Sequence, residues 1–157
     1  MPERPRRARL LEELDAKLRT VIADAVVFNH QVADRVGLNA TDAQCLNLLQ
    51  LHGPLPAGRL ARLTGLTTGA VTGALDRLER AGYVTRERTP EDRRKVIATP
   101  VQRKIERDIL PLYEPQGRRM AAIYEGFRND ELELILRYLS AMADVTVTGE
   151  PRERGGA

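Results

Sequence analysis

The sequence is poor in cysteine and in aromatic residues. Its 157 residues include one cysteine, Cys45, and no tryptophan, and aromatic side chains make up only 4% of the total. A single cysteine excludes an intramolecular disulfide and is typical of a reducing cytoplasm. So few aromatic rings also argue against the stacking platforms with which proteins bind single-stranded nucleic acid.

Long apolar runs and catalytic motifs are absent as well. The sequence has no run of 18 apolar residues, and its basic start, "MPERPRRARL", lacks the apolar region of a secretory signal. We therefore expect a cytoplasmic, nucleoid-associated protein with no membrane partner, and a disordered solubilising tail at the basic start. Nucleophile elbow, phosphate-binding loop and dinucleotide fingerprint are missing, and His30 and His52 are isolated. These absences predict that the protein is not an enzyme and holds no cofactor or metal.

What remains is the composition of a globular, well solvated protein. Hydrophobic residues make up 42% of the chain and charged residues 30%. The net charge is +3 and the isoelectric point is about 9.3. An excess this small says little about partners by itself, so the positions of the arginines matter more than their total.

The two ends of the chain are predicted to be helical and apolar on one side. Apolar residues recur at helical spacing from Arg9 to about Val36, and again in the last helix, which follows Asn129. Short neighbours within one small chain cannot cover stripes of this length, so we expect a second copy of the chain to cover them. The residues predicted to form this homodimer interface are Leu11, Leu14, Leu18, Val21, Leu132, Ile135, Leu139 and Met142.

Three short helices and a basic hairpin are predicted between these regions. The helices lie within "NATDAQCLNLLQLHG", within "LPAGRLARLTG", and from Thr67 to Gly82, and the runs "YVTRER" and "KVIAT" flank the charged turn "TPEDRR". Thr99 and Pro100 then resemble a helix cap and a first helical residue, and a kink is expected at Pro111 and Pro115. Helices followed directly by a basic hairpin are typical of a winged helix-turn-helix.

The predicted fold class is therefore mainly α with a small β-hairpin wing (α+β), a winged helix-turn-helix plus a helical dimerisation domain. The expected domains are an N-terminal dimerisation helix at 1–36, the winged helix-turn-helix at 37–99, C-terminal dimerisation helices at 100–146 and a flexible tail at 147–157.

The stretch "TTGAVTGALDRLERAGYV", residues 67–84, carries the prediction of DNA binding. Its first two turns contain poor helix formers, and each glycine costs roughly 1 kcal/mol against alanine. With the apolar residues turned inward, the outer face carries only the small side chains of threonine and glycine. The helix backbone can then approach the major groove of double-stranded DNA closely. The predicted contacts from this stretch are Thr67, Thr68, Gly69, Thr72, Gly73 and Arg77.

Arginines before, in and around the hairpin are predicted to complete the DNA interface. Arg59 precedes the recognition stretch and is a candidate phosphate contact, and the candidates in the hairpin are Arg86, Arg88, Arg93 and Arg94. An arginine at the tip of the wing suits the narrow minor groove, whose negative potential attracts a guanidinium. Asp92 is predicted to orient a neighbouring arginine by an ion pair.

The segment "LARLTGLTTGAVTGALDRLERAGYVTRERTPEDRRKV", with long helices on both sides, resembles the MarR family (multiple antibiotic resistance regulators). The resemblance implies a homodimer with interlocked terminal helices, with Arg94 in the minor groove and Asp92 steadying it and contacting Arg77. It also implies repression of transcription, relieved by a small phenolic or anionic ligand or by cysteine oxidation. Because a two-fold dimer reads two equivalent major grooves, we expect a pseudo-palindromic operator. Gly73 departs from the family, because many members carry a larger polar or basic residue there.

Two other functions and one further site stay open at this stage. A winged-helix module that only contacts proteins would lack the basic wing, and a redox-sensing regulator would have to use Cys45. Cys45 has no histidine or lysine nearby in the sequence to lower its pKa, which favours a buried structural thiol. Phe28, His30 and Cys45 are candidates for an effector pocket where the long helices meet the DNA-binding domain.

Overall fold

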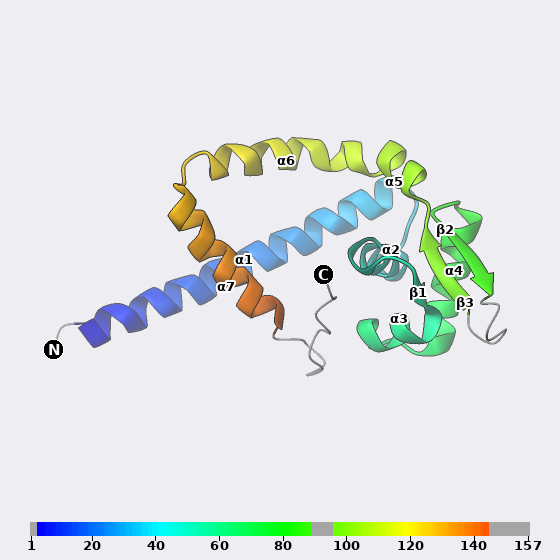
Figure 1. Ribbon diagram of the computed structural model, residues 1–157, viewed down its shortest axis with the longest axis horizontal. Coiled ribbons are helices and arrows are strands. Elements are labelled where there is room, and N and C mark those ends of the chain that lie inside the picture. Colours follow the sequence, from blue (N-terminus) through cyan, green and yellow to red (C-terminus); the bar gives the residue numbers. More distant parts are fainter. Residues whose placement is uncertain (1–2, 89–95, 145–157) are drawn as a thin grey trace.

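The computed structural model describes residues 3–88 and 96–144, and its fold is mainly helical with a small antiparallel sheet, as predicted. The elements are α1 (Glu3–Arg35), α2 (Ala40–His52), β1 (Leu55–Pro56), α3 (Ala57–Thr64), α4 (Thr68–Arg80), β2 (Val84–Arg88), β3 (Val96–Pro100), α5 (Gln102–Asp108), α6 (Leu110–Tyr124) and α7 (Asn129–Asp144). Figure 1 shows α2, α3, α4 and the sheet gathered into one lobe, from which α1 and α6 extend as long arms. We call this part, residues 40–88 and 96–100, the winged lobe.

The core of the winged lobe is formed by the apolar faces that the periodicity predicted. In α4 the buried side chains are Val71, Ala74, Leu75 and Leu78, which recur at helical spacing. They pack with residues of α2, α3 and the sheet in one hydrophobic cluster. Each fully buried leucine stabilises the fold by roughly 1.5–3 kcal/mol, so this face determines which side of α4 remains outside.

Local capping sets both ends of α4. The Thr67 hydroxyl oxygen accepts a hydrogen bond from the backbone N–H of Ala70 at 3.2 Å. At the other end Gly82 has φ +79°, and the N–H of Tyr83 donates to the carbonyl of Leu78 at 2.9 Å. This left-handed turn leads the chain from α4 directly into β2, so the connection between the helix and the wing is short.

The wing is a three-stranded sheet rather than a hairpin alone. β2 and β3 pair antiparallel, with Val84 opposite Pro100, and β1 pairs with the other edge of β3, giving the order β1-β3-β2. The sequence prediction was wrong at two places here. Leu55–Pro56 were assigned to a helix but form β1, and Pro100 was assigned to a helix start but ends β3. In both cases pairing with a strand distant in sequence overrides the local signal.

The long helices differ from the prediction at their ends. α1 begins at Glu3, so the basic start of the chain is largely helical and not a disordered tail. The helix after the wing breaks at Ile109, between α5 and α6, instead of at both prolines. Pro111 lies in the first turn of α6, where no N–H donor is needed, and α6 continues through Pro115.

Candidate nucleic-acid interface

The outer face of the first two turns of α4 is formed by small residues. Thr68, Gly69 and Thr72 are exposed, and Gly73 is half-buried. A Cβ atom placed on Gly69 would meet no described atom within 4 Å, so packing inside the protein gives no reason for glycine there. The packing of the described residues therefore does not explain the low helix propensity of this turn, and its predicted contact with DNA stays a prediction.

The hydroxyl of Thr72 is bound to its own helix. Its Oγ1 donates to the backbone carbonyl of Thr68 at 2.9 Å, which leaves the oxygen lone pairs and the methyl group for outside contacts. A methyl group and a hydrogen-bond acceptor match thymine methyls and base amino groups in the major groove. The exposed N-terminal turn of α4 adds backbone N–H groups and the positive end of the helix dipole, which favour phosphate.

Arg77, on the third turn of α4, is held by a residue that the sequence analysis missed. Its Nε lies 3.1 Å and 3.0 Å from the two carboxylate oxygens of Asp42 on α2, and its Nη2 lies 2.7 Å from Oδ1. Asp42 is 2% exposed, whereas the Arg77 side chain is 42% exposed. The resemblance had assigned the partner of Arg77 to Asp92.

The position of Asp42 was detectable in the sequence. It lies three residues before Cys45 and seven before Leu49, on the buried face of α2, so helical spacing puts a carboxylate into the core. A buried carboxylate requires a cationic partner, and a search for an arginine on the neighbouring helix would have led to Arg77.

Arg86 was predicted to contact DNA, and the structure gives it a different position. From β2 its guanidinium reaches two carboxylates of α4: Nη1 lies 2.6 Å from Asp76, and Nη2 lies 2.5 Å from Glu79. The side chain is only 24% exposed. Arg86 therefore fastens the wing strand to α4 through these two carboxylates, and its predicted contact with DNA stays a prediction.

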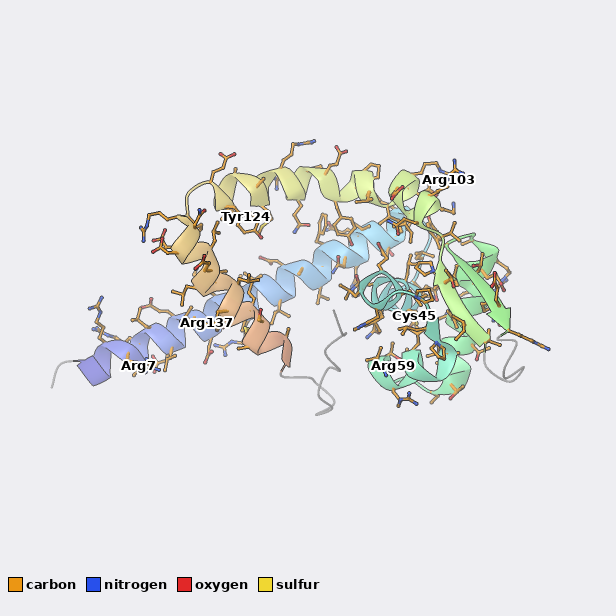
Figure 2. The ribbon with its side chains drawn as sticks, viewed as in Figure 1. Arg7, Cys45, Arg59, Arg103, Tyr124 and Arg137 are labelled. Atoms are coloured by element: carbon orange, nitrogen blue, oxygen red, sulfur yellow. The ribbon has the colours of Figure 1, made fainter. Side chains whose placement is uncertain are left out.

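The remaining predicted cations fall into two groups. Arg88 is exposed at the end of β2, and Arg59 lies on α3 at the border of the winged lobe (Figure 2). Arg93 and Arg94, with the predicted orienting residue Asp92, lie outside the described residues. The structure therefore brings α4 and β2 together and leaves the wing tip as a prediction from the sequence.

Cys45 lies inside the winged lobe, fully buried (Figure 2). Burial and, to a smaller extent, the nearby charge of Asp42 raise the pKa of its thiol to about 11, against an opposing effect of Arg77. A thiol that keeps its proton and has no exposed surface is a poor nucleophile toward peroxide. These properties favour the structural interpretation of Cys45 over a redox sensor.

A cavity of about 560 Å³ lies where α1 and α2 meet α5 and α6. His30 is among its lining residues, whereas Phe28 and Cys45 are not. Cys45 faces the core of the winged lobe, and the predicted effector pocket stays a prediction. The Phe28 ring packs edge-on against Tyr113, with centroids 5.2 Å apart.

Comparison with known proteins agrees with this geometry. The model of the MarR family matches residues 36–95. The chain is 38% identical over 120 residues to YcgE of Bacillus subtilis, described as an uncharacterized HTH-type transcriptional regulator, and the match covers 76% of this chain and 77% of that one. The chain belongs to the MarR family of helix-turn-helix transcriptional regulators. Members of this family bind DNA and are not enzymes.

Solved structures of other family members have the same fold. A MarR family protein from Bacillus stearothermophilus has a TM-score of 0.66 and 26% identity, covering 86% of this chain and 94% of that chain. The transcriptional regulator Tm0710 from Thermotoga maritima has a TM-score of 0.63 and 28% identity, covering 85% and 94%. The likeness covers most of the chain, well beyond the winged lobe.

The long helices of this MarR family regulator present many apolar side chains to the outside. In α1, Leu11 is 48% exposed, Leu14 51% and Val21 63%, and in α7 Leu139 is 51% exposed. The other residues predicted for the dimer interface are half-buried: Leu18, Leu132, Ile135 and Met142. Within the described part of the chain, no helix is long and apolar enough to cross a membrane.

α5 connects the cavity to the end of α4. Ile105 and Ile109 line the cavity, while Lys104 and Asp108 hold Tyr83, the residue after the α4 turn. The Lys104 ammonium lies 4.7 Å from the centre of the Tyr83 ring and 2.6 Å from the Asp108 carboxylate, which also accepts from the Tyr83 hydroxyl at 3.4 Å. α5 therefore touches both the cavity and the residue that follows the turn at the end of α4.

Proposed function

We propose that this MarR family regulator is a homodimeric, ligand-responsive repressor that binds a pseudo-palindromic operator in double-stranded DNA. The observation that carries the proposal is the exposed threonine and glycine face at the N-terminal end of α4, next to a wing that is fastened to the same helix. In such an assembly α4 enters the major groove and the wing reaches the adjacent minor groove. A regulator of this kind acts in the cytoplasm, where bacterial operators are accessible.

The contacts to DNA divide by chemistry. Thr68, Gly69 and Thr72 supply base contacts and close approach, with Gly73 behind them and Thr67 holding the helix end. Arg59 and Arg88 supply phosphate contacts at the borders of the interface, while Arg93 and Arg94 supply the contacts of the wing tip. Arg77 keeps enough exposed surface to reach DNA from its pair with Asp42.

A second copy of the chain is the proposed partner of the helical arms. The exposed leucines and valines of α1, together with those of α6 and α7, would form an apolar surface too large for a soluble monomer. A two-fold dimer then presents two α4 helices to half-sites about one helical turn of DNA apart.

Ligand response is the proposed role of the cavity between the winged lobe and the arms. α5 forms part of its wall and also holds Tyr83, so an occupant that displaces α5 would change the position of α4 relative to the arms. Release of the operator follows if the two α4 helices no longer match the spacing of the half-sites.

The proposal is tested by sedimentation equilibrium and by footprinting on the DNA upstream of the regulator's own gene. We expect a dimer at micromolar concentration and a footprint with two symmetric halves. A species of 17.6 kDa would contradict the dimer. Full affinity for a single asymmetric half-site would contradict two-fold reading of the operator.

A further inference from the structure

We infer that the cavity between α1, α2, α5 and α6 selects an uncharged ligand with an apolar body and several hydrogen-bonding groups, and discriminates against anions. The inference deepens the proposed function and rests on it for the consequence of binding. It narrows the phenolic or anionic effectors implied by the family resemblance to those without a formal charge.

The lining of the cavity has an apolar and a polar part. The apolar part is formed by Val26 and Leu110, which are about half exposed, in front of almost fully buried side chains: Val32, Leu46, Ile105 and Ile109. The polar lining consists of Asn29, His30, Gln44, Asn47, Gln50 and Tyr113. The three residues that α2 contributes to it follow each other at intervals of three, so their side chains lie on one stripe of that helix.

Much of this polar lining remains available to a ligand. The Tyr113 hydroxyl donates to the side-chain oxygen of Asn29 at 2.7 Å, so these two groups partly satisfy each other. Gln44, Asn47 and Gln50 are exposed, and each amide offers both donors and an acceptor. Amides of this kind recognise hydroxyl, amide and carbonyl groups without preferring either sign of charge.

The charge of the lining decides against an anion. Among the described residues that line the cavity there is no arginine, lysine, aspartate or glutamate. The carboxylate that α2 carries, Asp42, is not part of the lining: it is buried and paired with Arg77. A carboxylate entering the cavity would lose water and gain no permanent cation, whereas a neutral isostere would lose much less.

The volume of the cavity indicates that a well-fitting ligand is larger than a single aromatic ring. A volume of about 560 Å³ is within the usual range for small-molecule sites and much larger than a single aromatic ring. A bicyclic aromatic compound with a hydroxyl at one end and an amide at the other fits within this volume and can lie against the apolar lining.

The test is a calorimetric titration of the full-length protein, without DNA, with 6-hydroxy-2-naphthamide and with 6-hydroxy-2-naphthoate. The two probes differ in charge and hardly in shape. At pH 8 we expect the amide to bind at least about tenfold more tightly than the carboxylate, since only the carboxylate brings an unpaired charge.

A charge introduced into the lining should reverse this preference. Asn47→Arg adds a guanidinium at an exposed lining position of α2, and we expect it to favour the naphthoate. His52→Arg is the matched control, because it adds a cation at the exposed end of the same helix, outside the lining, and should leave the preference for the amide unchanged.

Three results would overturn the inference: equal or tighter binding of the naphthoate to the wild type, no binding of either probe, or an equal change of preference in both variants. An operator titration separates these outcomes from failure of the proposed function. If the amide binds as expected but does not release DNA, the ligand class stands and the ligand-responsive part of the proposed function fails.

Discussion

Arg77 of the recognition helix and Asp42 of α2 form a bidentate ion pair in which the carboxylate is buried and the guanidinium is half exposed. The pair connects α4 to α2. Residues of α2 close to Asp42, among them Ala43 and Gln44, line the cavity. Asp42 has its full set of partners only when α4 is correctly seated on α2. The exposed side of Arg77, by contrast, remains available to DNA.

Asp42→Asn should lower both stability and operator affinity. The amide cannot accept two charged hydrogen bonds, so we expect the free energy of unfolding to fall by about 1–3 kcal/mol. Operator binding should weaken even though the variant removes a negative charge from a DNA-binding protein. Urea unfolding and an operator titration at fixed salt measure the two effects. Unchanged affinity would mean that the pair serves stability alone.

Gly69→Ala should separate stability from DNA binding. The new methyl group meets no described atom within 4 Å, and alanine favours the helix by roughly 1 kcal/mol, so we expect a more stable protein. Operator affinity should nevertheless decrease, because the methyl group would hold the helix away from the groove. Gly117→Ala on α6, where the site is equally open, is the control for stability without loss of DNA binding.

Arg86→Ala and Arg88→Ala should both weaken operator binding, but with different salt dependence. Arg86 bridges Asp76 and Glu79 and acts through the position of the wing, so its loss should leave the slope of log K against log salt unchanged. Loss of Arg88, if it contacts phosphate, should reduce that slope by about 2 per dimer. A reduced slope for Arg86→Ala would show that Arg86 contacts phosphate after all.

Arg94→Ala should weaken operator binding by roughly tenfold or more, because the wing-tip guanidinium is predicted to enter the minor groove. Arg118→Ala is the control: Arg118 is exposed on α6 and paired with Glu114. Asp92→Ala should also weaken binding, since Arg94 would lose the partner that orients it. Counting charges predicts the opposite sign, so tighter binding by Asp92→Ala would refute the orienting role.

Cys45 should make stability depend on pH in the alkaline range. Its pKa is 9.0 in the unfolded reference and about 11 in the folded protein, so the folded state keeps the proton to higher pH. The resulting stabilisation is present below pH 9 and is lost as pH rises toward 11, by about 2–3 kcal/mol in total. Unfolding curves of wild type and Cys45→Ala should converge over this interval. Parallel curves would mean that the folded thiol ionises normally.

Local signals in the sequence were sufficient for the elements that depend on neighbours along the chain. The apolar period of α4, its Thr67 cap and the turn at Gly82 all involve residues within five positions of each other, so they could be predicted without knowing the fold. The basic hairpin and its place directly after α4 were predicted for the same reason. Together they indicated the family and the recognition helix.

Features that join distant segments were decided only by the tertiary structure. β1 forms because Leu55 meets Ala98 of β3, and Arg77 pairs with a carboxylate 35 residues away. Arg86 reaches Asp76 and Glu79 of α4 because the turn at Gly82 folds β2 back beside that helix. In each case the free energy comes from a partner whose proximity the local sequence does not encode. Composition and periodicity therefore determined which residues face inward, and packing determined which charges are paired within the chain.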